Sequence, residues 1–128
     1  MRDREGIVLD LRRRPPGSLL WLSAVVLEEL HAGARESDGG VLEKLERDFE
    51  KAGRLLVPNL NDWVQTGRVL SKFAAEYGYE EIGRSRLTND ALIAMSAARQ
   101  GITVITSNAR DFGRLARFRE FRWEVAQG

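Results

Sequence analysis

The chain contains no cysteine and only one histidine, His31, among its 128 residues. The lack of cysteine excludes disulfide bonds and thiolate metal sites, and a single histidine disfavours a structural zinc cluster. Any metal that this chain binds must therefore be held by oxygen atoms. Long apolar runs are also absent, because the stretch from Leu19 to Leu27 is interrupted by Ser23 and falls short of the ~20 residues that a membrane span needs. We therefore expect no membrane-spanning segment.

The N-terminal residues, Met1 to Gly6, carry charges of both signs and lack the apolar core of a secretory signal, so we expect a cytoplasmic protein. At 128 residues and 14.5 kDa the chain fits one domain, which we expect to span residues 1–128. Hydrophobic residues make up 43% of the sequence and charged residues 30%, a balance typical of a globular protein with a packed core.

The net charge is only +1, which gives no global indication of nucleic-acid binding. The type and distribution of the basic residues say more, because 17 of the 20 are arginine. They cluster at Arg12–Arg14, at Arg84 and Arg86, and from Arg110 to Arg122. Arginine suits phosphate because its planar guanidinium donates two parallel hydrogen bonds. For each cluster, the alternative interpretation is a solvated face with internal ion pairs.

Apolar runs alternate with amphipathic stretches between glycine and proline residues along the chain. The pattern predicts strands at Leu19–Leu22, Leu55–Val57, Ile102–Thr106 and Phe121–Val125. It predicts helices at Ala24–Ala32 after an N-cap at Ser23, at Val41–Ala52, at Asn61–Tyr77, and from a cap at Thr88 or Asn89 to Gly101. We expect loops at Tyr79–Leu87 and Asn108–Phe112.

Strands separated by helices of ten or more residues indicate right-handed crossovers and a parallel sheet with helices on both faces. The expected fold class is therefore α/β, a three-layer α/β/α domain with a central, mainly parallel sheet. Ligands of such sheets gather at the carboxyl ends of the strands. Trp21 and His31 interleave with the apolar residues of the first strand and helix, so we expect both to be buried and to have no chemical role.

Three acidic residues are predicted to lie near this edge of the sheet. Asp111 follows the predicted strand Ile102–Thr106, and Asp90 lies in the first helical turn, where the helix dipole favours a carboxylate. Glu29 lies a turn and a half into its helix, within reach of the same edge. Three oxygen ligands suit Mg²⁺ or Mn²⁺, which can activate water and offset charge on a phosphoryl transition state. The reaction class served by this chemistry is phosphodiester hydrolysis.

Each acid also has a purely structural interpretation. Asp90 can be an ordinary acid at a helix N-terminus. Glu29, beside Glu28, can be one of two solvent-facing helix acids, and Asp111 can cap the turn or helix after Asn108.

Three segments, in the same order, resemble the later acidic motifs of PIN domains. Leu22–Gly33 is similar to the second motif, a strand end and Ser followed by a helix that carries Glu-Leu and then Gly. Leu87–Ala97 is similar to the third, with Asp-Ala-Leu-Ile-Ala, and Gly101–Phe112 to the fourth, with Thr-x-Asn-x-x-Asp-Phe. The resemblance points to the VapC-like toxins of toxin-antitoxin pairs. It implies an endoribonuclease that depends on Mg²⁺ or Mn²⁺.

The resemblance also implies roles for individual residues. Glu29, Asp90 and Asp111 correspond to catalytic residues and metal ligands, and Asn108 is a further ligand at a position where many relatives carry Asp. The residues expected to meet the RNA substrate are Thr106, Ser107, Arg84, Arg86 and Arg110. The family implies a homodimer that is held silent by a protein antitoxin, which inserts a segment into the active groove.

The chain departs from the family at its first motif, a strand that ends in Asp-Thr or Asp-Ser. Gly6–Asp10 could be a shortened first strand with Asp10 as the ligand, but only 12 residues then separate Asp10 from Ser23, too few for a parallel crossover. We favour a helix at Arg4–Arg14 and a first strand encoded upstream of Met1. An upstream strand ending in Asp would favour an active ribonuclease. A stop codon there would favour a module that binds an antitoxin or nucleic acid without cleaving.

Overall fold

The computed structural model describes residues 19–84 and 87–126, apart from the side chain of Arg84. Its elements are β1 (Leu22–Ser23), α1 (Ala24–Ala32), η2 (Glu36–Asp38), α2 (Gly39–Lys51), β2 (Leu55–Leu56), α3 (Leu60–Tyr77), α4 (Tyr79–Arg84), α5 (Leu87–Gln100), β3 (Val104–Thr106), α6 (Ala109–Ala116) and β4 (Trp123–Val125). Asp10, Arg12–Arg14 and Arg86 lie outside the described residues. Within the described ranges, no helix has both the length and the apolar character of a membrane span.

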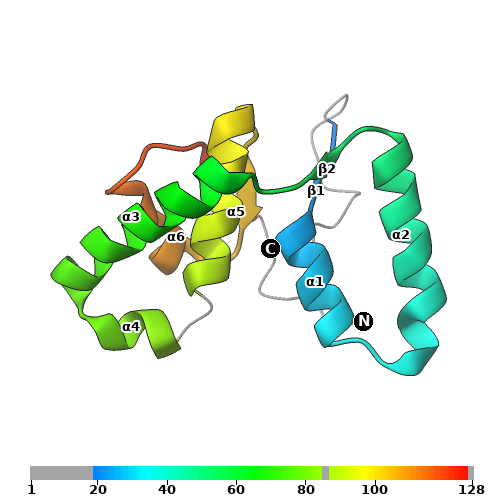
Figure 1. Ribbon diagram of the computed structural model, residues 1–128, viewed down its shortest axis with the longest axis horizontal. Helices are drawn as coiled ribbons and strands as arrows, with labels where there is room; N and C mark the ends of the chain where they lie inside the picture. Colours follow the sequence, from blue (N-terminus) through cyan, green and yellow to red (C-terminus); the bar gives the residue numbers. More distant parts are fainter. Residues whose placement is uncertain (1–18, 85–86, 127–128) are drawn as a thin grey trace.

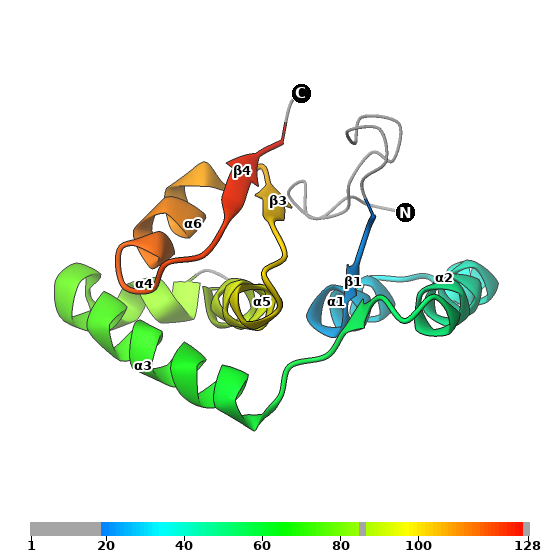
Figure 2. The same cartoon turned by 90° about the horizontal axis from the view of Figure 1, so that it is seen from above.

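The elements form two halves, as Figures 1 and 2 show. In one half, β1, α1, η2, α2 and β2 follow each other in the chain, and the other half runs from α3 to β4. β1 pairs in parallel with β2, and β3 pairs in parallel with β4. The α/β class and the parallel pairing are thus confirmed. Among the described residues, however, the strands form two separate two-stranded sheets in place of the single central sheet that was predicted.

The strands of the first half are short for local reasons. β2 pairs Leu55 with Leu22 and Leu56 with Ser23. Before it, Gly53 adopts a φ of 70°, in the left-handed region that glycine tolerates and that ends the preceding helix. After it, Pro58 has no backbone N–H to donate to a ladder. A ladder confined between these two residues cannot extend over the predicted strand from Leu19.

α1 begins and ends as predicted, with Ser23 as its N-cap and Gly33 as its C-cap. Its buried face comprises Val25, Val26 and Leu30. The predicted burial of Trp21 and His31 is wrong, because Trp21 is 37% exposed and His31 is also exposed. His31 is next to Leu30 in sequence, but successive residues of a helix point in different directions, so it lies off the buried face.

The second half contains most of the hydrophobic core. Seven consecutive residues of α5, from Ala91 to Ala97, are buried. α3 packs against one side of α5, while α5 contacts β3 and α6 contacts β4, so the β3–β4 sheet has a helix against each strand. Phe73 of α3 and Phe112 of α6 are both completely buried in this core.

Three predicted boundaries need correction in this half. Both predicted loops are largely helical, because Tyr79–Arg84 forms α4 and Ala109–Ala116 forms α6. α5 begins at Leu87, before the predicted caps, so Asn89 lies inside its first turn. A capping role for Thr88 or Asn89 is therefore wrong, whereas the placement of Asp90 in the first turn is confirmed.

Candidate active site

Glu29 lies on α1 in a half-buried position. α1 starts one residue after Ser23, whose Oγ accepts a hydrogen bond from the backbone N–H of Val25 at 3.1 Å. The Oε2 atom of Glu29 accepts a hydrogen bond from Nδ2 of Asn89 at 3.0 Å, and its Oε1 atom is buried. This contact spans 60 residues of sequence and joins α1 to the first turn of α5.

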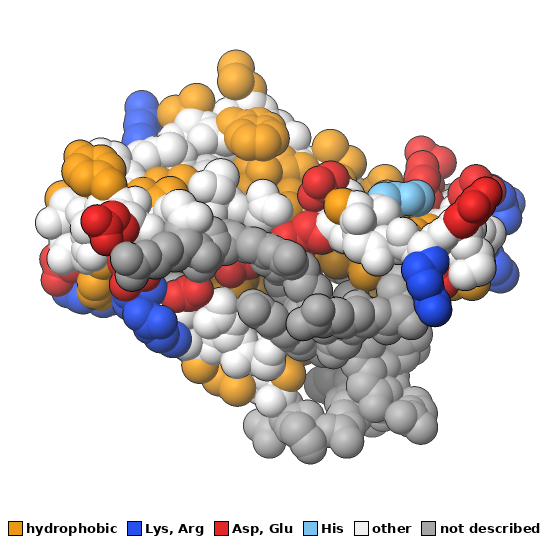
Figure 3. Space-filling model, turned by 90° about the horizontal axis from the view of Figure 1, so that it is seen from below, with side chains coloured by type: hydrophobic (Ala, Val, Ile, Leu, Met, Phe, Trp, Pro, Cys, Tyr) orange, Lys and Arg blue, Asp and Glu red, His pale blue; other side chains and the backbone are white. Residues whose placement is uncertain are grey.

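Asp90 directly follows Asn89 in α5 and is only 2% exposed. Its carboxylate lies at the helix N-terminus, where unpaired backbone N–H groups and the helix dipole favour negative charge. Ala91, the next residue, and Ala94, one helical turn further along, are completely buried, so the core holds the backbone that carries Asp90. The structure therefore brings Glu29 and the turn that bears Asp90 to the junction of the two halves. Figure 3 shows acidic side chains near the middle of this face.

Asp111 lies in the first turn of α6 and is 7% exposed. Nδ2 of Asn108, the N-cap residue, donates to Oδ2 of Asp111 at 3.0 Å, and Oδ1 of Asn108 accepts from the backbone N–H of Asp111 at 3.2 Å. The other carboxylate oxygen, Oδ1, accepts from the guanidinium of Arg114 at 2.8 Å. Both oxygens of Asp111 are thus engaged by neighbouring side chains.

Arg114 fixes this arrangement from the opposite side. Its guanidinium carbon lies 4.7 Å from the ring centroids of both Phe73 and Tyr77, within the range of a cation–π contact. A guanidinium nitrogen of Arg114 also lies 3.8 Å from Oε1 of Glu81 on α4. One partly buried arginine therefore ties the first turn of α6 to α3 and α4.

The predicted substrate-contact residues lie in different environments. Thr106 is completely buried, and its Oγ1 accepts a hydrogen bond from the backbone N–H of Asn108 at 3.0 Å, so it shapes the loop before α6. Ser107 is exposed, and so is Arg110, whose guanidinium lies 3.4 Å from Glu81. The side chain of Arg84 is outside the described part of the chain, as is Arg86.

Some of the predicted metal ligands have positions that suit a divalent cation, and others do not. Within residues 19–84 and 87–126, no three His, Cys, Asp or Glu side chains lie close enough to hold a metal together. The carboxylate of Asp111 contacts Arg114 and Asn108, whereas Glu29 contacts Asn89, the residue before Asp90. Mg²⁺ is commonly bound by one or two carboxylates, several waters and substrate phosphates. The carboxylates of Glu29 and Asp90 would suit that mode of binding better than an all-protein cage.

Sequence reasoning missed two residues of this region. Asn89 was considered only as a helix cap, yet it contacts Glu29. Arg114 received no individual role, although its spacing of three residues from Asp111 on a helix is one that favours an ion pair. Recognising either required knowing that these segments are helical from Leu87 and from Ala109.

Parallel strands joined by helices define an α/β domain, a class that binds its ligands beside the carboxyl ends of its strands. The chain matches the PIN domain family over residues 2–118, and it belongs to that family. PIN domains are generally metal-dependent nucleases and typically bind divalent metals. A comparison with curated proteins gave no significant match. The VapC toxin type and a single domain over 1–128 stay predictions.

Proposed function

We propose that this PIN domain is an endoribonuclease that depends on Mg²⁺ or Mn²⁺ and is the toxin of a type II toxin-antitoxin pair. The observation that carries the proposal is the hydrogen bond between Asn89 and Glu29, because it joins the turn bearing Asp90 to a second carboxylate from the other half. Membership of the PIN family supports nuclease chemistry at this position. The specificity for RNA and the toxin role rest on the three segments that resemble acidic motifs of VapC-like PIN domains.

Glu29 and Asp90 would hold the cation, and Asn108 could add its amide oxygen. When bound, such a cation lowers the pKa of a coordinated water and offsets charge on the phosphoryl group. The exposed Ser107 and Arg110 lie just before α6 and in its first turn, where they can meet a phosphate of the RNA backbone. Asp111, held by Arg114, would orient Asn108 and so act as a positioning residue.

Cleavage of RNA by the purified chain with Mg²⁺ or Mn²⁺ tests the proposal. Asp90→Asn removes a charge from the cation site without changing its shape, so we expect cleavage to fall by at least about 100-fold. The chain offers a matched pair in Glu29→Gln and Glu28→Gln, since Glu28 is the exposed neighbour on the same helix. Glu29→Gln should impair cleavage and Glu28→Gln should not. Undiminished cleavage in Asp90→Asn would contradict the assignment.

A second candidate function is a PIN-like module that binds an antitoxin or nucleic acid without cleaving. It is favoured by the engagement of both Asp111 oxygens and by the lack of a three-acid group among the described residues. The two functions differ in one assay. A module of this kind would bind labelled RNA or its antitoxin in the presence of Mn²⁺ and leave the RNA intact, with no dependence of binding on Asp90.

The toxin role has a cellular test. Expression of the chain in the cytoplasm of a bacterial host should arrest growth, and co-expression of the protein encoded beside it, the expected antitoxin, should relieve the arrest. Arrest that persists in Asp90→Asn would separate toxicity from the proposed cleavage.

A further inference from the structure

The segment Arg110–Arg122 contains five arginines, and they fall into two groups. Three of them form ion pairs with Glu76, Glu81 or Asp111, namely Arg110, Arg114 and Arg117. The other two, Arg119 and Arg122, are exposed and form no ion pair within the part of the chain that the structure describes. The fold therefore leaves two guanidinium groups free to meet an anion.

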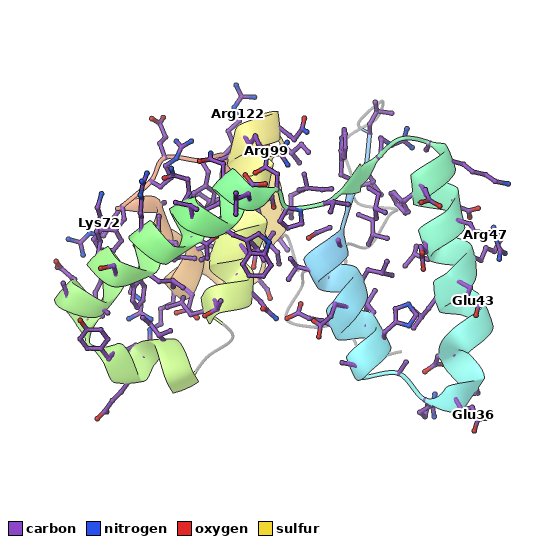
Figure 4. All side chains as sticks on the ribbon, in the orientation of Figure 1. Glu36, Glu43, Arg47, Lys72, Arg99 and Arg122 are labelled. Atoms are coloured by element: carbon purple, nitrogen blue, oxygen red, sulfur yellow. The ribbon has the colours of Figure 1, made fainter. Side chains whose placement is uncertain are left out.

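Both of these arginines line the same cavity, which has a volume of about 310 Å³ and which we call the α5–β4 cavity. Ala98, Gly101 and Ile102, at the C-terminal end of α5, form one wall, and Arg119–Arg122, just before β4, form the other. Figure 4 shows Arg122 beside the upper end of α5. Ligand pockets in proteins have volumes from about 300 to 1,000 Å³, so the α5–β4 cavity has room for one small ligand.

Backbone hydrogen bonds hold both walls in place. α5 ends in a Schellman motif, in which Gly101 adopts a φ of 68° and the backbone N–H of Ile102 donates to the backbone oxygen of Ala97 at 2.9 Å. On the opposite wall, the backbone oxygen of Arg122 accepts a hydrogen bond from the backbone N–H of Val104 at 2.9 Å. A cavity with walls held in this way needs little further ordering when a ligand binds.

Two guanidinium groups at one cavity favour a phosphate monoester over a carboxylate. A single guanidinium can engage both oxygens of a carboxylate, so the second arginine would have no partner. A phosphate monoester has three acceptor oxygens and a charge of about −1.5 to −2 at pH 7. The two positive charges of Arg119 and Arg122 match that charge, and both guanidinium groups can donate to it at once.

The other lining residues favour a nucleotide over a bare phosphate. The carboxylate of Glu120 would repel an anion unless the same ligand also donates hydrogen bonds, as ribose hydroxyls and the amino groups of bases do. Ala98 and Ile102 are half-buried and give the cavity an apolar surface, on which a base can lie beside a guanidinium. A nucleotide thus provides a group for each part of the lining.

We propose that the α5–β4 cavity is a second binding site of this chain, for a nucleotide that carries a terminal phosphate monoester. The phosphate contacts Arg119 and Arg122, and the base lies on Ala98 and Ile102. The nucleotide is either free or the phosphorylated end of an RNA strand, since both present the same groups. α5 has 14 residues, so its two ends lie roughly 20 Å apart, and the cavity is separate from Asp90 in the first turn.

Calorimetric titration of the full chain with AMP and GMP tests the site without any assay of cleavage, after divalent cations have been removed with a chelating resin. At least one nucleotide should bind at a single site, adenosine and guanosine should not bind measurably, and inorganic phosphate should bind at least about tenfold more weakly. Arg119→Gln and Arg122→Gln should each weaken nucleotide binding by about tenfold or more, because each removes a charge-assisted hydrogen bond. Arg47→Gln, at an exposed position of α2, should leave binding unchanged.

Competition with an RNA hexanucleotide distinguishes the two sources of the phosphate. If a strand with a 5′-phosphate displaces the nucleotide and the same strand without it does not, the ligand is an RNA end. If neither strand displaces it, the ligand is a free nucleotide. The proposal is overturned if neither AMP nor GMP binds, if binding is the same in Arg119→Gln and Arg122→Gln, or if the strand without a terminal phosphate competes equally well. Nucleotide binding should persist in Asp90→Asn, so a failure of RNA cleavage would bear on the proposed function alone.

Discussion

The two halves of the molecule are stabilised by different means. In the half from α3 to β4, α5 buries seven residues in succession, and aromatic rings from α3 and α6 fill the space around it. In the other half, the 13 residues of α2 include one that is buried, Leu42. Figure 4 shows Glu43 and Arg47 on the outer side of α2, directed toward solvent. Burial of apolar side chains stabilises the half from α3 to β4, whereas the half from β1 to β2 relies more on surface contacts.

The candidate active site combines residues from both halves. Asp90 is supplied by the densely packed half and Glu29 by the lighter half, with Asn89 donating the hydrogen bond between them. Mobility of α1 relative to α5 would therefore separate the two carboxylates before it affected either helix. The relative stability of the halves thus matters for function as well as for folding, and it can be tested by substitution.

The largest expected effect is in the densely packed half. Phe73→Ala removes a completely buried ring that lies 4.7 Å from Tyr77, and it should lower the free energy of unfolding by about 3–5 kcal/mol. Phe49 on α2 is the matched control, because it is the same residue type in a half-buried position. Phe49→Ala should cost less than half as much in urea denaturation. Equal losses would mean that the halves are equally well packed.

The next effect concerns the ion pair that holds the start of α3 against α5. Arg99→Met leaves the carboxylate of Asp62, whose side chain is 2% exposed, without its cationic partner and frees the carbonyl of Val57. Breaking a buried pair costs about 3–5 kcal/mol, and because the Arg99 side chain is 30% exposed we expect about 2 kcal/mol. Arg68→Met, at an exposed position of α3, should change stability by less than about 0.5 kcal/mol. Similar losses in both variants would show that the Asp62 pair contributes little.

Helical and strand segments with clear periodicity could be predicted from the sequence. The apolar spacing in Asn61–Tyr77 predicted α3 to within one residue, and the β-branched run before Thr106 predicted β3. The ends of α1 at Ser23 and Gly33 could also be predicted, because helix capping depends on local hydrogen bonds. The parallel pairing followed from the lengths of the crossovers, a general constraint on chain connection.

The features that could not be predicted depend on contacts between residues that are distant in sequence. Asn108–Phe112 was predicted to be the loop after a strand, but α6 begins at Ala109. Gly113 of α6 lies against Trp123, whose ring would be 3.6 Å from an added Cβ. For the site, the sequence identified Glu29 and Asp90 as candidates, and the structure brings Glu29 to the turn of Asp90. It could not show that Arg114 holds Asp111, because this depends on how α6 packs against Phe73 and Tyr77.

A smaller effect is expected at the contact between Asn89 and Glu29. Asn89→Ala removes one partly exposed hydrogen bond to a carboxylate and should cost about 1 kcal/mol. A double-mutant cycle with Glu29→Gln should give a coupling energy of about 0.5–1 kcal/mol, and Thr88→Ala at the exposed neighbouring position should show none. Additive effects of Asn89→Ala and Glu29→Gln would mean that the hydrogen bond does not hold α1 against α5.

The smallest effect is expected on α2, where Nζ of Lys44 donates to Oδ2 of Asp48 at 2.7 Å on the surface. This hydrogen bond, with the nearby positive charges, holds the pKa of Asp48 below its ordinary value of 3.8. A carboxyl whose pKa is lowered in the folded state contributes stability above its unfolded pKa, and this contribution is lost as the pH falls through the folded pKa. Lys44→Met should therefore raise the pKa of Asp48, measured by NMR titration. It should lower the melting temperature slightly at pH 7 and leave it unchanged in strong acid, where Asp48 is protonated in both proteins. A loss at pH 7 as large as that of Phe73→Ala would contradict the view that α2 is stabilised mainly by weak surface contacts.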